Sequence, residues 1–114
     1  MVEPNDELLR IGQVVELSGT PATTIRYYEQ LGLLVAATRV GGQRRFHASV
    51  IATLMVIRFC RVAGLSLEDV AIVLDDRSPG RASTRDVAAR QIERIDAQMA
   101  ELALARSMMV AAAS

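Results

Sequence analysis

The sequence predicts a mainly α-helical fold, in which a winged helix-turn-helix is followed by one long helix with a coiled-coil seam. Two short helical patterns stand on either side of a tight turn, and a glycine pair follows them between two strand-like segments. Towards the C-terminus, apolar residues recur at alternating steps of four and three. The length of 114 residues suits one small domain with one appendage, and a content of 51% hydrophobic and 23% charged residues excludes a wholly disordered chain.

The first predicted helix rests on Ile11, Val14 and Val15, which keep helical spacing. Ser18 and Gly19 follow, and a glycine at this point is typical of a helix end because it accepts the left-handed backbone conformation without strain. We therefore expect a short helix that stops at a turn.

The second predicted helix begins directly after that turn. Thr20 has a side chain suited to capping a helix N-terminus, and Pro21 suits the first helical position because no partner is needed for its missing N–H. The helix should run from Pro21 to Leu31 and stop at Gly32. Two helices joined so tightly predict a helix-turn-helix.

A small wing is predicted over residues 35–46. β-branched residues precede Gly41 and Gly42, and Phe46 follows them. Two glycines suit the positive φ angles of a two-residue hairpin turn. We therefore expect two short strands joined at this pair.

The next predicted helix covers residues 49–63 and is apolar on nearly every side except at Arg58 and Arg61. A helix that is hydrophobic all round is usually the central helix of its domain, and we expect that role for this one. Gly64 should end it.

A short helix should then lead into a hinge. Ser66, with Asp69 three residues later, resembles a capping box and predicts a helix that ends near Leu74. Residues 76–83 are polar and contain a Pro-Gly pair, which predicts a hinge or loop.

A long helix is predicted over residues 84–112, about 40 Å at 1.5 Å per residue. Its repeated apolar positions, called the seam below, share one face of this helix. The seam consists of Ala88, Ile92, Ile95, Met99, Leu102 and Met109, with Arg106 as one interruption. A lone helix of this kind can bury its seam only on a partner, which favours a homodimer.

The net charge of zero hides an uneven distribution. Lysine is absent and all 13 cations are arginine, balanced by 13 acids. Residues 1–7 carry a charge of −3, residues 8–63 carry +5 and residues 64–114 carry −2. The four aromatic residues, Tyr27, Tyr28, Phe46 and Phe59, lie in the basic block. Such a block favours nucleic acid as a partner.

The second helix carries one polar face. Helical spacing puts Thr23, Arg26, Tyr27 and Gln30 on this face, whereas Ala22, Ile25 and Tyr28 lie nearer the other. Such a face can enter a DNA major groove, with side chains reaching base edges and phosphates. An ordinary solvated helix surface is the alternative.

Arginines also gather in and after the wing. Gln43, Arg44 and Arg45 follow the hairpin turn, where they can reach the DNA backbone or serve only as a charged edge that prevents aggregation. Arg58 and Arg61 lie one turn apart on an apolar helix. They either meet an anion or form a polar stripe towards water.

Three segments together resemble the MerR family of bacterial transcription regulators. They read IGQVVELSGTPATTIRYYEQLGLL, then GGQRRF, then IRFCRVAGLSLEDVAIVL. The resemblance implies a tail over residues 1–7, a DNA-binding domain over 8–75, a hinge over 76–83 and an antiparallel dimerisation helix over 84–112. It is specific because the three motifs occur in this order.

The resemblance implies DNA-binding roles at individual positions. Thr23, Thr24 and Arg26 match the recognition helix, and Tyr27 and Tyr28 match a tyrosine pair that grips the DNA backbone. Arg44, which lies between Gln43 and Arg45, matches the wing arginine, and Arg61 and Arg58 match basic positions beside a second wing that touch phosphates. Members of the family bind as dimers to inverted repeats in promoters. They distort the DNA so that RNA polymerase can use both promoter elements.

The chain departs from the family pattern at several positions. Gln43 replaces a common tyrosine, as in the SoxR-like branch, Pro21 replaces a serine cap, and His47 stands where a serine or threonine cap is common. Metal-sensing members carry cysteines flanking the dimerisation helix, whereas Cys60 is the single cysteine here. We expect no thiolate metal site, no iron–sulfur cluster and no cofactor, and interpret Cys60 as a small buried hydrophobic residue.

The sequence thus predicts a cytoplasmic, nucleoid-associated transcription regulator that is not an enzyme, since no catalytic constellation is visible. Its expected partners are double-stranded promoter DNA, a second copy of the chain, RNA polymerase indirectly, and an effector of unknown identity. No apolar run is long enough to span a membrane, so no membrane partner is expected. The alternatives are an architectural DNA-bending factor similar to excisionases and a coiled-coil interaction adaptor.

Overall fold

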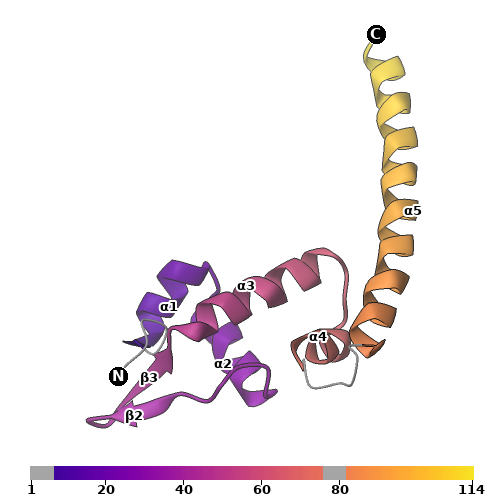
Figure 1. The fold of residues 1–114 in the computed structure, drawn as a ribbon. Helices are drawn as coiled ribbons and strands as arrows, with labels where there is room; N and C mark the ends of the chain where they lie inside the picture. Colours follow the sequence, from indigo (N-terminus) through magenta and orange to yellow (C-terminus); the bar gives the residue numbers. More distant parts are fainter. Residues whose placement is uncertain (1–6, 76–81) are drawn as a thin grey trace. The chain divides into compact units, whose positions relative to one another are not determined.

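The structure, a computed structural model, describes residues 7–75 and 82–114 (Figure 1). It is mainly α-helical, which confirms the predicted fold class. The chain divides into two compact units, Met1–Cys60 and Arg61–Ser114. The predicted hinge over residues 76–83 lies outside the described residues, except for its last two residues, which already belong to the long helix α5 (Ala82–Ala113).

The first unit begins with the predicted helix-turn-helix. Helix α1 (Ile11–Ser18) ends where Gly19 adopts a φ of +70° and donates its N–H to the carbonyl of Val15. Helix α2 (Ala22–Gln30) follows, and Gly32 after it has a φ of +78°. Both turns use the left-handed conformation that glycine adopts at low cost.

The predicted capping of α2 by Thr20 is wrong. Pro21 occupies the N-cap position, and no side chain bonds to the first turn. The physical reason lies in the preceding helix, where the Ser18 hydroxyl accepts the Thr20 backbone N–H at 3.1 Å. The turn is thus stabilised from the C-terminal end of α1, and α2 begins one residue later than expected.

The predicted hairpin is confirmed, and a third strand joins it. Strands β2 (Thr38–Val40) and β3 (Gln43–His47) are antiparallel, with Gly41 at φ +58° and Gly42 at φ +81° in the turn. Strand β1 (Leu8–Leu9) pairs with the other edge of β3, giving the order β1-β3-β2. Two residues are too few to show strand alternation, which explains why β1 was not predicted.

Helix α3 (Ser49–Val62) follows the sheet. One of its sides is buried in the core through Val50, Leu54 and Ile57. On its other side Met55, Val56, Phe59 and Val62 are exposed, although the helix is apolar on both sides. The single chain therefore covers one face of α3 and leaves the other open to solvent.

Every element of the first unit except β2 contributes to one core. The buried apolar side chains are Leu9, Val14, Ile25, Leu34, Phe46, Val50, Leu54 and Ile57. Phe46, Ile25 and Val14 are almost completely removed from water. This core fixes α2 and β3, the two elements that present the predicted polar residues.

The second unit holds helix α4 (Leu67–Leu74) against the start of α5. Ser66 caps α4 by accepting the Asp69 backbone N–H at 3.1 Å, as predicted. Val87 of α5 is buried, and Arg90 pairs with Asp69 at 3.0 Å. Figure 1 shows α5 continuing beyond these turns towards the C-terminus. Every residue of 96–114 is exposed.

The start of α5 is also joined to the turn after α3. Gln91 is 6% exposed and donates its side-chain amide to the carbonyl of Ala63. Gly64 has a φ of +88°, and a Cβ atom there would stand 2.8 Å from Nε2 of Gln91. Glycine at position 64 therefore permits both the turn and this buried contact.

Candidate nucleic-acid interface

The polar face of α2 lies at the surface of the first unit. Its side chains are Thr23, Arg26, Tyr27 and Gln30, and all four are exposed. Ile25, on the other side of the helix, is fully buried. The predicted orientation of α2 is therefore confirmed: its donor-rich face points to solvent and its apolar face to the core.

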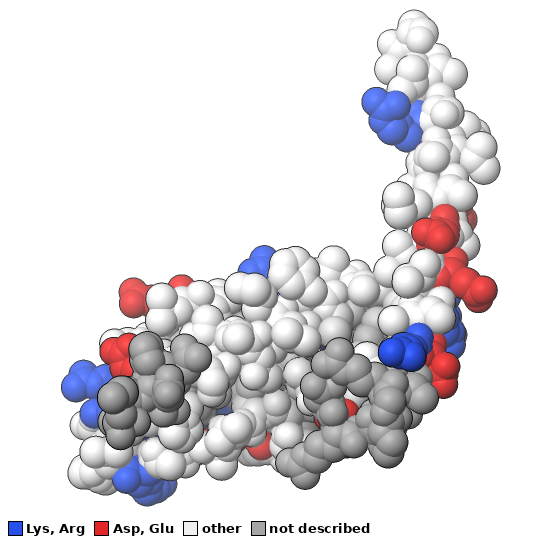
Figure 2. Space-filling model, in the orientation of Figure 1, with Lys and Arg blue, Asp and Glu red and all other residues white. Residues whose placement is uncertain are grey.

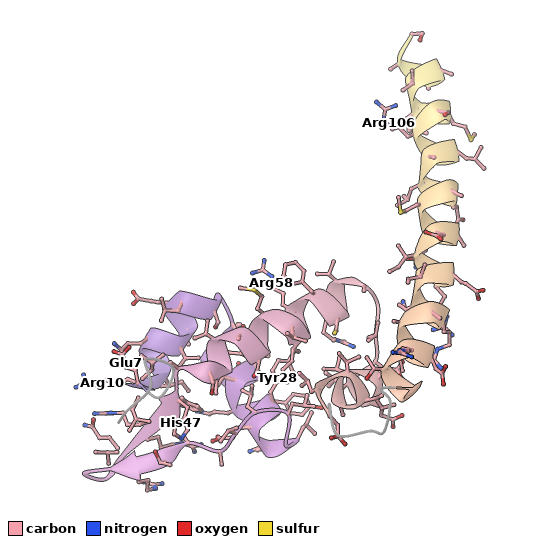
Figure 3. All side chains as sticks on the ribbon, viewed as in Figure 1. Glu7, Arg10, Tyr28, His47, Arg58 and Arg106 are labelled. Carbon is pink, nitrogen blue, oxygen red and sulfur yellow. The ribbon has the colours of Figure 1, made fainter. Side chains whose placement is uncertain are left out.

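Two tyrosines border this polar face. Tyr27 is 49% exposed, whereas Tyr28 is half-buried (Figure 3). The centroids of their rings lie 6.2 Å apart, with the planes tilted by 39°. Thr24 is half-buried as well. Of the three, Tyr27 offers its side chain to a partner most openly.

The N-terminal turn of α2 is open to an anion. It contains no acidic residue, and no side chain caps its backbone N–H groups. These N–H groups form the positive end of the helix dipole, which favours negative charge. The N-terminal end of α2 and the side chain of Arg26 are thus both positive and both favour an anion.

The wing carries arginines on both of its strands. Arg39 of β2 stands directly opposite Arg44 of β3, and Thr38 stands opposite Arg45. Directly opposed side chains lie on the same face of a ribbon, so Arg39 and Arg44 form a like-charge pair, which is unfavourable on its own. Figure 2 shows the arginines gathered around β2 and β3, with a mostly uncharged surface along α3.

An acid from α2 neutralises part of this charge. Arg44 forms an ion pair with Glu29, and its guanidinium carbon lies 6.0 Å from the centroid of the Phe46 ring. Glu29 also accepts the backbone N–H of Ala37 at 2.6 Å. Arg45 is half-buried, with its Nη1 3.4 Å from the carbonyl oxygen of Arg44. Helix α2 and the wing are therefore joined by side-chain bonds.

The two arginines of α3 do not join this group. Arg58 is exposed, and its Nη1 lies 3.8 Å from the place of a Cβ atom on Gly19. In Figure 3 it points away from Tyr28. Arg61 belongs to the second unit and donates to the carbonyl of Leu65 at 2.7 Å. The structure thus gives Arg61 a local bond that the sequence did not predict.

The seam on α5 is open to solvent. Ile92, Met99, Leu102 and Met109 are each more than half exposed, and Ile95 is half-buried. The residues that pack on the rest of the second unit, Val87 and Gln91, lie beside the seam and not in it. The seam is thus free for a partner, and its role in dimerisation stays a prediction.

Cys60 has the character of a structural cysteine. Its side chain is partly buried, and this burial raises the pKa of the thiol above its usual value, which lowers the fraction of reactive thiolate. Within residues 7–75 and 82–114, no group of three or more His, Cys, Asp or Glu side chains is placed to hold a metal ion. Within the same ranges, no helix is both long and apolar enough to cross a membrane.

Sequence reasoning missed two residues of this surface. Arg39 was overlooked because it precedes the glycine pair, and only the strand register places it opposite Arg44. Glu29 carries no local sequence signal, because no spacing rule connects it with residues 8 and 15 positions later. Both contacts depend on the folded hairpin.

Comparison with known proteins gives the chain a clear set of relatives. A family model described as MerR HTH family regulatory protein matches residues 9–77, and a second, described as MerR, DNA binding, matches residues 51–112. The HTH-type transcriptional regulator HmrR of Rhizobium leguminosarum bv. viciae is 33% identical over 97 residues, which cover 82% of this chain and 75% of that protein. Three further curated relatives, two NolA nodulation proteins and a SoxR homolog, are longer, and the chain spans 40 to 57% of their length.

Solved structures show the same fold. The transcription regulator PbrR691 from Ralstonia metallidurans CH34, in complex with lead(II), is 28% identical, with a TM-score of 0.67 over 89% of this chain and 83% of that one. HiNmlR, a MerR family regulator lacking the sensor domain and bound to promoter DNA, is 25% identical, with a TM-score of 0.68 over 84% and 76% of the two chains.

Proposed function

The chain belongs to the MerR family of helix-turn-helix regulatory proteins, which bind DNA and regulate transcription, and we propose that it acts as a homodimer on inverted repeats in promoters. One observation carries the proposal: the polar face of α2 and the arginines of the wing belong to the same compact unit, joined by Glu29. The proposed functional domains are residues 8–75 for DNA binding and 84–112 for dimerisation.

In this proposal α2 enters the major groove. Thr23 and Arg26 are exposed on its polar face and reach base edges or phosphates, while Tyr27 donates its hydroxyl to a phosphate oxygen. Thr24 and Tyr28, both half-buried, support this surface from its border. The uncapped first turn of α2 adds a favourable field for the phosphate backbone.

The wing then contacts the backbone beside that groove. Gln43, Arg44 and Arg45 were expected there from the sequence, and Arg39 joins them through its pairing with β3. An opposed pair of arginines is destabilising in the free protein, and a phosphate relieves that repulsion. We assign Arg58 and Arg61 to backbone contacts at the margin of the site.

The homodimer forms through α5. Two copies placed antiparallel bury each other's seam, which removes from water the exposed side chains of Ile92, Met99 and Leu102. A two-fold symmetric dimer presents two copies of α2, and therefore suits an inverted repeat.

The dimer controls transcription by deforming the DNA between its half-sites. Phosphate contacts from α2 and the wing supply the energy of this deformation, which brings both promoter elements into reach of RNA polymerase. The protein acts in the cytoplasm at the nucleoid, is not an enzyme and uses no cofactor. An effector of unknown identity is its remaining proposed partner.

Selection of genomic DNA fragments by the purified protein tests this proposal. The selected duplexes should contain inverted repeats within promoters, and in vitro transcription from them should change when the protein is added, with and without cell metabolites. Bent DNA with unchanged transcription would support an architectural factor instead. Failure to select any sequence, together with a weak dependence of DNA affinity on salt, would support a coiled-coil adaptor.

A further inference from the structure

Glu29 is an acid within a surface whose other charges are cationic. It is one of two acids among residues 8–63, the other being Glu16. Its side chain is only 11% exposed, and it lies on the flank of α2 that faces the wing. A carboxylate close to DNA repels phosphate, so its neighbours decide whether it hinders or helps binding.

Both carboxylate oxygens of Glu29 are bonded to the wing. Oε1 accepts from Nη2 of Arg44 on β3, and Oε2 accepts the backbone N–H of Ala37 at 2.6 Å, directly before β2. A single side chain of α2 thus contacts β3 and the residue that leads into β2. The Ala37 bond also satisfies a backbone N–H that no ladder bond of β2 covers.

Arg44 is held from a second direction. Its guanidinium carbon lies 6.0 Å from the centroid of the Phe46 ring, and Phe46 is 1% exposed within the core. The side chain of Arg44 nevertheless remains 46% exposed. Because a guanidinium has five N–H donors, the bond to Glu29 leaves donors free for a phosphate oxygen.

We propose that Glu29 is a positioning residue for DNA binding, which fixes Arg44 and the wing against α2 so that helix and wing meet the duplex in one geometry. This inference rests on the proposed function, because the position of Arg44 matters to affinity only if the wing contacts DNA. Holding Arg44 in place before DNA arrives reduces the side-chain entropy lost on binding. That gain outweighs the repulsion between the Glu29 carboxylate and phosphate, which Arg44 already neutralises.

The direction in which one substitution changes DNA affinity tests the proposal. Glu29→Gln keeps the shape and an oxygen for the Ala37 N–H but removes the charge that holds Arg44. Removal of an acid from a DNA-binding surface ordinarily raises affinity, and the matched variant Glu16→Gln, on the exposed side of α1, should show that rise. Glu29→Gln should instead lower affinity for a duplex selected by the wild type, by about three- to tenfold.

A double-mutant cycle with Arg44→Gln isolates the cause. In the Arg44→Gln background there is no guanidinium to hold, so Glu29→Gln should no longer lower affinity and should raise it slightly, as Glu16→Gln does. An equal loss in both backgrounds overturns the proposal, because it indicates a general effect on folding. A rise in affinity for Glu29→Gln in the wild-type background overturns it as well.

A readout without DNA separates this inference from the proposed function. In the free protein, Glu29→Ala should speed hydrogen exchange at the Ala37 amide by about tenfold or more, whereas Glu29→Gln should leave it close to wild type. If the Ala37 amide exchanges at an unchanged rate in Glu29→Ala, the proposal that Glu29 holds the wing through this amide is overturned. Absence of DNA binding by the wild type, in contrast, refutes the proposed function and leaves the exchange result standing.

Discussion

The first unit and the C-terminal part of α5 are both rich in apolar residues but use them in opposite ways. In Met1–Cys60, side chains from α1, α2, α3, β1 and β3 are buried in one core. In residues 96–114, leucine, methionine and valine side chains are all exposed, including Leu104 at 70% and Met108 at 68%. One region completes its own core, and the other presents apolar surface that a single chain cannot cover.

The difference indicates which parts of the molecule depend on a partner. Exposed apolar patches of this extent mark interaction sites in soluble proteins. The elements that we assign to DNA recognition fold on contacts within one chain, whereas the seam of α5 is exposed in the single chain and is covered by a second copy only in the proposed dimer. Folding of the recognition surface and assembly of the dimer should therefore respond to different mutations.

The largest expected effect follows from placing a charge in the seam. Leu102→Glu removes one leucine from each copy, and because each buried leucine contributes about 1.5–3 kcal/mol, the dimer should weaken by about 10²- to 10⁴-fold. Sedimentation velocity should show a monomer, and binding to the inverted repeat should be lost in parallel. Ala97→Glu, half a turn away on the exposed back of α5, is the matched control and should leave the dimer intact. If Leu102→Glu remains a dimer, the assignment of the seam to the dimer interface is contradicted.

The two phenylalanines allow a direct test of the core. Phe46 is 1% exposed and Phe59 is 65% exposed. Phe46→Ala should destabilise the protein by about 3–5 kcal/mol, and Phe59→Ala by less than about 1 kcal/mol, in urea unfolding at a fixed protein concentration. Equal losses would show that α3 is covered on its outer side.

Substitutions of two glycines by alanine should change the stability of the protein in opposite directions, one through backbone strain and the other through helix propensity. Gly64→Ala forces a side chain to φ +88° and places its Cβ 2.8 Å from Gln91, so it should destabilise the second unit by about 1–3 kcal/mol. Gly12→Ala, within α1 and with nothing near its Cβ position, should stabilise the protein by about 0.5–1 kcal/mol. Circular dichroism during thermal unfolding measures both, and shifts of the same sign would be inconsistent with these glycine environments.

The smallest expected effect concerns Arg61. If it contacts one phosphate, Arg61→Ala should reduce the slope of log affinity against log salt by about one unit. The variant also loses the bond to the Leu65 carbonyl, which is worth about 1 kcal/mol of stability. If stability falls but the salt slope is unchanged, Arg61 stabilises the turn after α3 and does not contact a phosphate.

Local patterns predicted most of the fold because local chemistry determines it. Gly19 and the pair at Gly41 and Gly42 mark turns through their own positive φ angles, and Ser66 caps the next helix through its own hydroxyl. The predicted and observed orientations of α2 agree because helical spacing alone places Ile25 opposite the polar face.

Contacts between distant residues could not be predicted in the same way. Pairing of β1 with β3 joins Leu9 to Phe46, and the bond of Glu29 to Arg44 spans 15 residues. The exposed side of α3 could not be predicted for a related reason, because composition does not determine how many neighbours a helix has. Whether the seam, the wing and Arg61 act as assigned depends on a partner and on DNA.

Sedimentation of the wild-type protein with a fluorescent duplex that carries one selected inverted repeat tests the central claim most directly. At micromolar protein, we expect free protein at twice the 12.4 kDa mass of the chain and a DNA complex that contains two chains. A monomer in free solution, or a saturated complex with one chain per duplex, would contradict the proposal that α5 pairs two copies of the DNA-binding unit.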